Sequence, residues 1–221
     1  LYVNNEGDNN YTFIEQGNDN KDNSLKFDIK NISITNTEII YENINQNQNH
    51  RIYAHSLEGK LSVIDAKTNI KLTSKSEIQQ IESDNKRFLE NKNINLSCNL
   101  IVNTDFKTID IPLAKITIEK SNFTANGFIN YDKNIYKSTI KASNTSFKTI
   151  ISLLPNAVSK PLKKYNSKGI ANFDLKLNKE NSKQIFPEIT VNFGCKNVSL
   201  TEINTQKSIE NLSFTGRFTN G

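Results

Sequence analysis

Two histidines and two cysteines are the residues of this chain with the most reactive side chains. His50 and His55 lie five positions apart, without the further ligands that a zinc site needs, so we interpret them as solvent-exposed polar residues. Cys98 and Cys195 are far apart and fit no metal-binding or redox spacing. We expect both to be small buried hydrophobic residues, with a disulfide between them as the alternative.

The charged residues give little support for catalysis. Carboxylates alternate with lysines, as on a solvated face, and the 28 basic residues are spread along a chain of net charge +5 and pI near 9.0. The lysines at 160, 163, 164 and 168 are placed to meet lipid phosphate, although a solvated helix face is the simpler interpretation. The sequence holds no phosphate-binding glycine loop, no Gly-x-Ser-x-Gly elbow and no paired-histidine motif, so we expect no enzyme, metal or cofactor.

Period-two alternation of apolar and polar residues is the dominant pattern, and it predicts antiparallel strands wetted on one face. The cleanest run alternates Ile94, Leu96, Cys98, Leu100 and Val102 with mostly polar residues. Shorter runs recur at residues 27–29, 57–63, 109–113, 123–131, 171–177, 189–195 and 212–218. Turn-rich stretches at 43–49 and 178–182 separate such runs, so we expect a mainly β fold of about nine strands.

Two segments depart from the strand pattern. Residues 1–24 are mostly polar, and we expect a mobile lead-in there. Apolar residues at 147, 150, 151 and 154 follow helical spacing and precede Pro155, which predicts a short helix over residues 147–154. Residues 158–165 form a second candidate, so one or two short helices are expected between 146 and 165.

The apolar face of so many strands needs a cover, and two short helices cannot supply it. Patterning alone favours a sandwich whose halves bury each other, with a lined groove or an open barrel as alternatives. An open apolar groove would mark a ligand or membrane surface. No run approaches the 18 or so apolar residues of a membrane span. Because the chain lacks an initial Met, we expect a fragment of a longer protein that carries any anchor elsewhere.

The order of segments resembles the AsmA-like family of bacterial envelope proteins, in the form found in Bacteroidota. The most family-like stretch is I-K-A-S-N-T-S-F-K-T-I-I-S-L-L-P at 140–155, a strand running into a short helix. The other matching segments are a strand pair at 25–34 and 38–42, followed by 57–61, 122–130, 168–177, 186–194 and 209–221. The resemblance covers residues 25–221 and implies one segment of a long, gutter-like antiparallel β-groove with an apolar inside.

The resemblance implies the periplasmic part of a membrane-anchored protein that binds or conducts phospholipid between the inner and outer membranes. Its partners would be phospholipid acyl chains, the membrane through a segment outside these residues, and other envelope proteins, but no nucleic acid. No catalytic residue is implied. We expect the helix to cover one end of the groove, and the lining to include Ile94, Leu96, Leu100, Val102, Phe123, Ile129, Phe173, Leu175, Val191 and Phe193.

Two other functions fit a β-rich chain of this kind. One is a structural or chaperone-like domain that helps to assemble outer-membrane proteins through its exposed strand edges. The other is a secreted adhesin or carbohydrate-binding sandwich with an aromatic surface patch, against which the absence of Trp argues.

Overall fold

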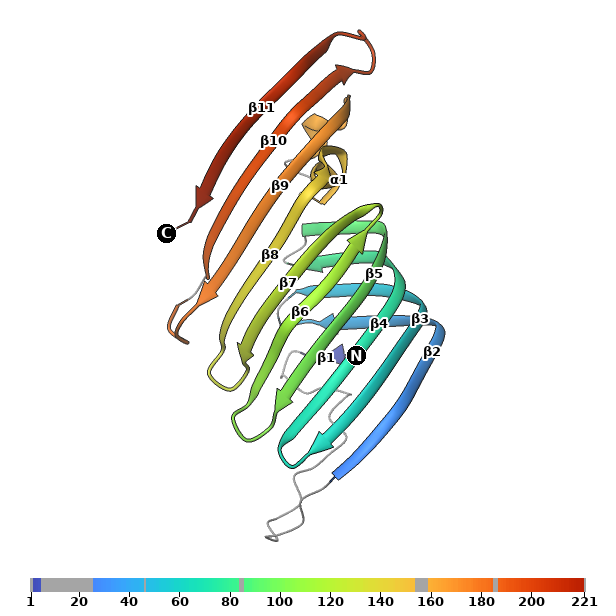
Figure 1. Cartoon of the computed structure of the whole chain (residues 1–221), viewed down its shortest axis with the longest axis vertical. Helices are drawn as coiled ribbons and strands as arrows, with labels where there is room; N and C mark the ends of the chain where they lie inside the picture. Colours follow the sequence, from blue (N-terminus) through green and yellow to red (C-terminus); the bar gives the residue numbers. More distant parts are fainter. Residues whose placement is uncertain are drawn as a thin grey trace.

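A single β-sheet contains most of the chain, and in this computed structural model 77% of the residues are in strands. The structure describes residues 2–4, 26–45, 47–83, 86–153, 159–184 and 187–220. The sheet has eleven strands in simple sequence order (Figure 1), and it is open and uncurled. The expected mainly β, antiparallel fold is therefore confirmed, whereas the sandwich that patterning alone favours is wrong.

The strands are long, and each pairs with its neighbours in the chain. Ten of them are antiparallel, and β1 (Tyr2–Val3) pairs in parallel with the end of β2 (Lys26–Asn43). The others are β3 (Gln48–Ile64), β4 (Lys67–Ser83), β5 (Lys86–Asn103), β6 (Thr108–Ile118), β7 (Ser121–Asn130), β8 (Ile135–Ser146), β9 (Tyr165–Lys179), β10 (Glu188–Glu202) and β11 (Ser208–Thr219). Both predicted turn regions, 43–49 and 178–182, include a connection between strands, although their outer residues belong to β2, β3 and β9. The expected mobile lead-in falls almost wholly on residues 5–25, which lie outside the described residues.

One strand replaces the strand pair expected at 25–34 and 38–42. Strand β2 continues through the polar residues between them, and Thr35 and Thr37 both pair with β3. Asn36 takes a φ of 49° between them. Because Asn tolerates the left-handed region better than most residues, the strand passes through this irregularity without reversing.

Asparagines hold most of the left-handed backbone positions of the sheet. Seven of the eleven non-glycine residues with positive φ in the described part are Asn. Asn144 and Asn197 lie at register shifts of β8 and β10, and Asn211 lies at a shift of β11. An extra residue at such a bulge bends the strand and increases its twist. The abundance of Asn therefore has a structural use in this sheet.

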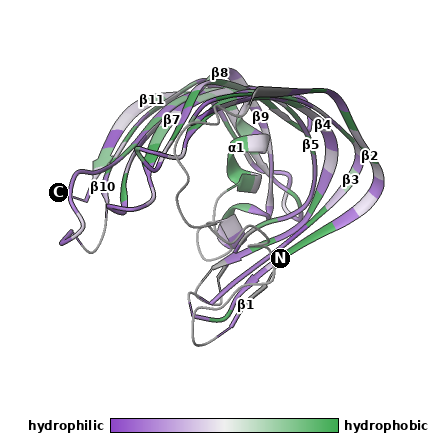
Figure 2. Cartoon of the chain, turned by 90° about the horizontal axis from the view of Figure 1, so that it is seen from below, coloured by the Kyte–Doolittle hydropathy of each residue, from purple (hydrophilic) through white to green (hydrophobic). Residues whose placement is uncertain are grey.

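One short helix, α1 (Phe147–Leu153), packs on one side of the sheet, toward which β2–β5 bend (Figure 2). The predicted helix at 147–154 is thus confirmed over its first seven residues. Of the second candidate helix, at 158–165, the described residues 159–165 contain the one-turn 3₁₀ helix η1 (Lys160–Leu162), and β9 begins at Tyr165. Pro161 lies in the first turn of η1, where its missing backbone donor is tolerated. No helix in the described part is long and apolar enough to cross a membrane.

Candidate functional site

The ten predicted lining residues all lie on one face of the sheet, as the strand register shows. One cross-strand row runs through all ten antiparallel strands, since each member pairs with the next. This row consists of Ile34, Leu57, Ser74, Leu96, Ile116, Phe123, Ala142, Phe173, Phe193 and Gly216. A neighbouring row contains Leu72, Cys98, Ala114, Ala125, Ile140, Leu175, Val191 and Phe218. We call the surface formed by these two rows and the remaining predicted lining residues the apolar face.

The opposite face of the sheet is polar. Between Leu96 and Leu100 on β5, the other side carries Ser97 and Asn99. Two ion pairs lie on this side, with 3.7 Å from Lys141 Nζ of β8 to Asp174 Oδ2 of β9, and 3.7 Å from Lys137 Nζ of β8 to Oε1 of Glu180, which directly follows β9. Asn178, which donates a hydrogen bond to Glu180, and then Lys137 lower the pKa of the Glu180 carboxyl. The sheet is therefore amphipathic across its thickness, with one face suited to water.

No second sheet covers the apolar face within the described residues. Of the ten predicted lining residues only Phe123 is buried, Ile129 and Phe193 are exposed, and the other seven are half-buried. Further large apolar side chains of this face are exposed near its two edges, among them Ile34, Phe214 and Phe218. This surface is a face of an open sheet, and the curled, gutter-like groove that the resemblance implies is wrong in that respect.

Helix α1 covers one end of the apolar face. Ile150 and Leu153 pack against the buried cluster of Ile118, Phe123 and Ala142. Phe147 and Ile150 also contact a second buried cluster of Ala171, Cys195 and Val198. The helix therefore creates a local core, and the rest of the face stays open.

Aromatic side chains organise the open end near β11. The rings of Phe193 and Phe214 meet edge to face with centroids 6.2 Å apart. The Phe193 ring lies over Gly216, where a Cβ would clash with the Phe193 Cζ atom. A glycine at this position thus leaves the space that the ring occupies. The pairing of Phe193 with Gly216 could not be read from the sequence without the register.

Each cysteine is buried, and each histidine contacts a tyrosine ring. Both cysteines are free and buried on the apolar face, as expected, and burial raises the pKa of the Cys98 thiol. His50 stacks on Tyr41 with ring centroids 5.6 Å apart, and His55 meets Tyr53 edge to face. No three His, Cys, Asp or Glu side chains of the described part are close enough together to hold a metal ion.

Sequence reasoning missed the contribution of β4 to this face. Ile70 and Leu72 lie beside Leu100 and Cys98 of β5, but Ser74 and Ser76 take the next two positions on the same side. The two serine hydroxyls are hydrogen-bonded to each other. Ser74 and Ser76 therefore interrupt the apolar alternation of β4 before Ile78, and only the strand register identifies this segment as part of the face.

Comparisons with known proteins identified no relative of this chain. No protein-family model, curated protein or solved structure matches the chain. The assignment of a function therefore depends on the amphipathic sheet itself.

Proposed function

We propose that this chain is a non-enzymatic segment of an AsmA-like envelope protein whose apolar face binds or conducts phospholipid between the inner and outer membranes. The observation that carries the proposal is the row of mainly apolar side chains across ten strands, which α1 covers around Phe123 and which no second sheet covers among the described residues. Soluble proteins seldom leave so continuous an apolar surface open unless something binds it. In this proposal the protein works in the periplasm of a Gram-negative cell.

Acyl chains suit this surface better than a compact ligand does. Each methylene removed from water contributes about 0.8 kcal/mol, so a few strands can hold a lipid without specific polar contacts. Long apolar rows present many equivalent positions along the sheet, which favours movement of a chain over capture at one point. The polar opposite face keeps the same strands in water.

A pair of adjacent substitutions on β5 tests the proposal. Leu100 lies on the apolar face, and Ile101 lies on the polar face beside Asn69 and Asp110. The protein is expressed in bacteria, purified without detergent and analysed by native mass spectrometry with lipid extraction. We expect phospholipid to be retained by the wild type and by Ile101→Asp, and lost from Leu100→Asp.

Three outcomes would contradict the proposal. A lipid-free wild type would mean that the face does not take up phospholipid. Equal loss of lipid from both variants would mean that the effect has no face dependence. If Leu100→Asp unfolds by circular dichroism while Ile101→Asp does not, Leu100 belongs to a structural core and is not a lipid contact.

The exposed edge of the sheet favours a second candidate function. Strand β11 ends the strand order, and nearly all of its residues are exposed. An unpaired edge can add a strand from another protein through main-chain hydrogen bonds. In this alternative the chain is a structural or chaperone-like domain that assists outer-membrane protein assembly. Crosslinks from β11 to nascent barrel proteins, with no lipid bound, would favour it over the first proposal.

A further inference from the structure

A notch interrupts one end of the sheet, because three central strands stop before their neighbours do. Pairing between β5 and β6 ends at Ile94 and Ile118, and the turn after β6 is held there by a 3.0 Å hydrogen bond from Glu119 N to Asn93 O. Pairing between β8 and β9 ends at Ser146 and Ile170. Residues 86–93 of β5 and 165–169 of β9 therefore extend past β6, β7 and β8.

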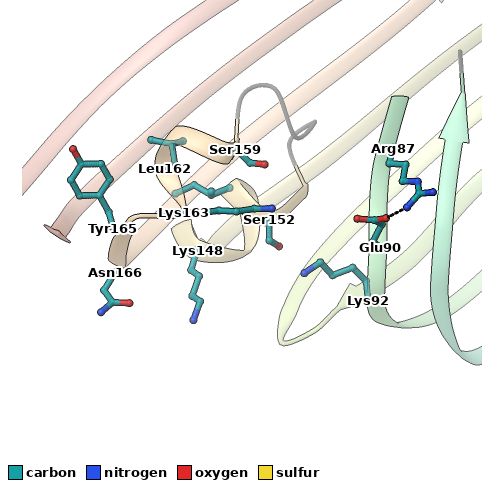
Figure 3. A pocket seen from close by; sticks show the side chains of 11 residues that line it. Arg87, Glu90, Lys92, Lys148, Ser152, Ser159, Leu162, Lys163, Tyr165 and Asn166 are labelled. Atoms are coloured by element: carbon teal, nitrogen blue, oxygen red, sulfur yellow. Dashed lines mark hydrogen bonds and ion pairs between the residues drawn. The ribbon is translucent and has the colours of Figure 1, made fainter. Parts of the chain in front are cut away.

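Helix α1 and η1 lie in this notch and leave a pocket beside them (Figure 3). The pocket has a volume of about 330 Å³. That volume leaves room for a phosphate ester group together with several water molecules. Its walls come from β5, α1, η1 and the first residues of β9, so it is assembled only when these four elements meet.

Lysines from three different parts of the chain line the pocket. They are Lys92 of β5, Lys148 of α1 and Lys163, which directly follows η1. Lys92 extends from β5 toward α1, from which Lys148 extends (Figure 3). Neither Lys92 nor Lys148 has an ion-pair partner within the described part of the chain.

Arg87 and Glu90 also line the pocket, and Glu82 lies beside Arg87. Arg87 makes 2.8 Å ion pairs with both Glu82 and Glu90, and these two carboxylates raise the pKa of the guanidinium. The two carboxylates are thus engaged by Arg87, and together these three groups carry one net negative charge. The two positive charges of Lys92 and Lys148 exceed this negative charge, which favours an anionic ligand.

The pocket adjoins the apolar face directly. Ile151 of α1 lines it, and the preceding residue, Ile150, packs on the apolar face. Lys92 is two residues from Ile94 on the same strand, and Ile94 contacts the cluster under α1. A single ligand with an anionic group and long apolar chains would therefore find both of its surfaces side by side.

We infer that the pocket between β5, α1 and η1 binds the anionic phosphate headgroup of a lipid whose acyl chains lie on the apolar face. This inference rests on the proposed lipid-binding function and adds a fixed end to it. Lys92, Lys148 and Lys163 make charge-assisted contacts with the phosphate oxygens, and Ile151 and Leu162 shield its ester side. A lipid enters the open sheet at this end, with its headgroup held by the notch.

Two fluorescent probes with the same acyl chains test the inference. One is a pyrene-labelled phosphatidylglycerol and the other is the corresponding pyrene-labelled diacylglycerol, each titrated against the whole chain below its aggregation concentration. In a triple variant with Lys92→Gln, Lys148→Gln and Lys163→Gln, we expect about tenfold weaker binding of phosphatidylglycerol and unchanged binding of diacylglycerol.

A matched variant controls for the loss of three positive charges. Lys60, Lys115 and Lys176 are exposed on the polar face, and their replacement by Gln changes the net charge by the same amount. We expect this control variant to bind both probes as the wild type does. Raising the salt concentration on the wild type gives a second measurement that needs no variant, and it should weaken only phosphatidylglycerol binding.

The outcomes separate failure of this inference from failure of the proposed function. If the wild type binds neither probe, the lipid-binding proposal and the headgroup site fall together. If it binds both probes equally and neither salt nor the triple variant discriminates between them, the headgroup site alone is wrong. If glycerol 3-phosphate binds as tightly as phosphatidylglycerol, the pocket is a site for soluble phosphates with no link to the apolar face.

Discussion

Two phenylalanines in one cross-strand row show that the apolar face is covered in one region and open to solvent in another. Phe123 lies under α1 and is 5% exposed, whereas Phe193, three strands further along the same row, is 40% exposed. Both residues come from the same alternating pattern in the sequence. What separates core from open surface on this sheet is therefore the position of one seven-residue helix, and not the pattern of the strands.

The largest expected effect comes from removing the two rings separately. We expect Phe123→Ala to lower the free energy of unfolding by about 3–5 kcal/mol, because it leaves a cavity under α1. Phe193→Ala should cost about 1–2 kcal/mol, since much of that ring is already in water. Denaturant unfolding followed by circular dichroism measures both values. Equal losses would show that the open end is packed as tightly as the covered end.

Glycine substitutions give the next largest contrast. Gly169 has a φ of +111°, and a Cβ there would meet the Val198 Cα at 2.7 Å and the Asn197 carbonyl oxygen at 2.8 Å. These are backbone atoms near the covered end, so we expect Gly169→Ala to destabilise the protein by about 2 kcal/mol or more. Thermal unfolding of the purified variant provides the measurement.

Gly59→Ala is the matched control for Gly169→Ala. A Cβ at Gly59 would lie 3.6 Å from the nearest atom, the Cβ of Ile32, which is an ordinary contact. Its stability should be unchanged or raised by up to about 1 kcal/mol, because alanine restricts the unfolded chain. A loss at Gly59 as large as that at Gly169 would mean that positive φ is not the cause.

At the open end a similar clash should cost less. Gly216→Ala brings a Cβ against the Phe193 ring, but that ring can turn away into solvent. We expect a loss of about 1 kcal/mol or less, together with loss of the NMR cross-peaks between the Phe193 and Phe214 rings. If Gly216→Ala proves as damaging as Gly169→Ala, Phe193 is held rigidly and the open end is not adaptable.

The smallest expected effect concerns Cys98 at alkaline pH. Burial raises the pKa of this thiol, so in the range just above the ordinary thiol pKa of about 8.5 the unfolded chain has lost a proton that the folded chain retains. Deprotonation then favours the unfolded state, and stability falls as pH rises through this window. Cys98→Ala should lose less stability than the wild type between pH 8 and 10, as measured by urea unfolding. An identical alkaline loss in both proteins would contradict this prediction.

Alternation was sufficient to predict β5, and it placed all ten lining residues on one face. It did not identify β4, because Ser74 and Ser76 interrupt the apolar side of that strand. Period two also reveals which side of a strand is apolar but not what covers that side, so the choice between a sandwich and an open sheet needed the structure. The charged pocket could not be predicted from the sequence for a related reason. Lys92, Lys148 and Lys163 are far apart in the chain or on different elements, and they line one pocket only because α1 and η1 lie in the notch.

The consecutive strand order has a consequence for folding and for growth of the sheet. Every antiparallel pair joins strands that follow one another in the chain, so contacts between them are local in sequence. Low contact order favours rapid formation, and this sheet can assemble hairpin by hairpin without waiting for distant segments. The same order means that adding a hairpin at β11 would widen the apolar face by about 10 Å while every existing pair stays as it is. The extent of such a surface is then set by the number of hairpins alone.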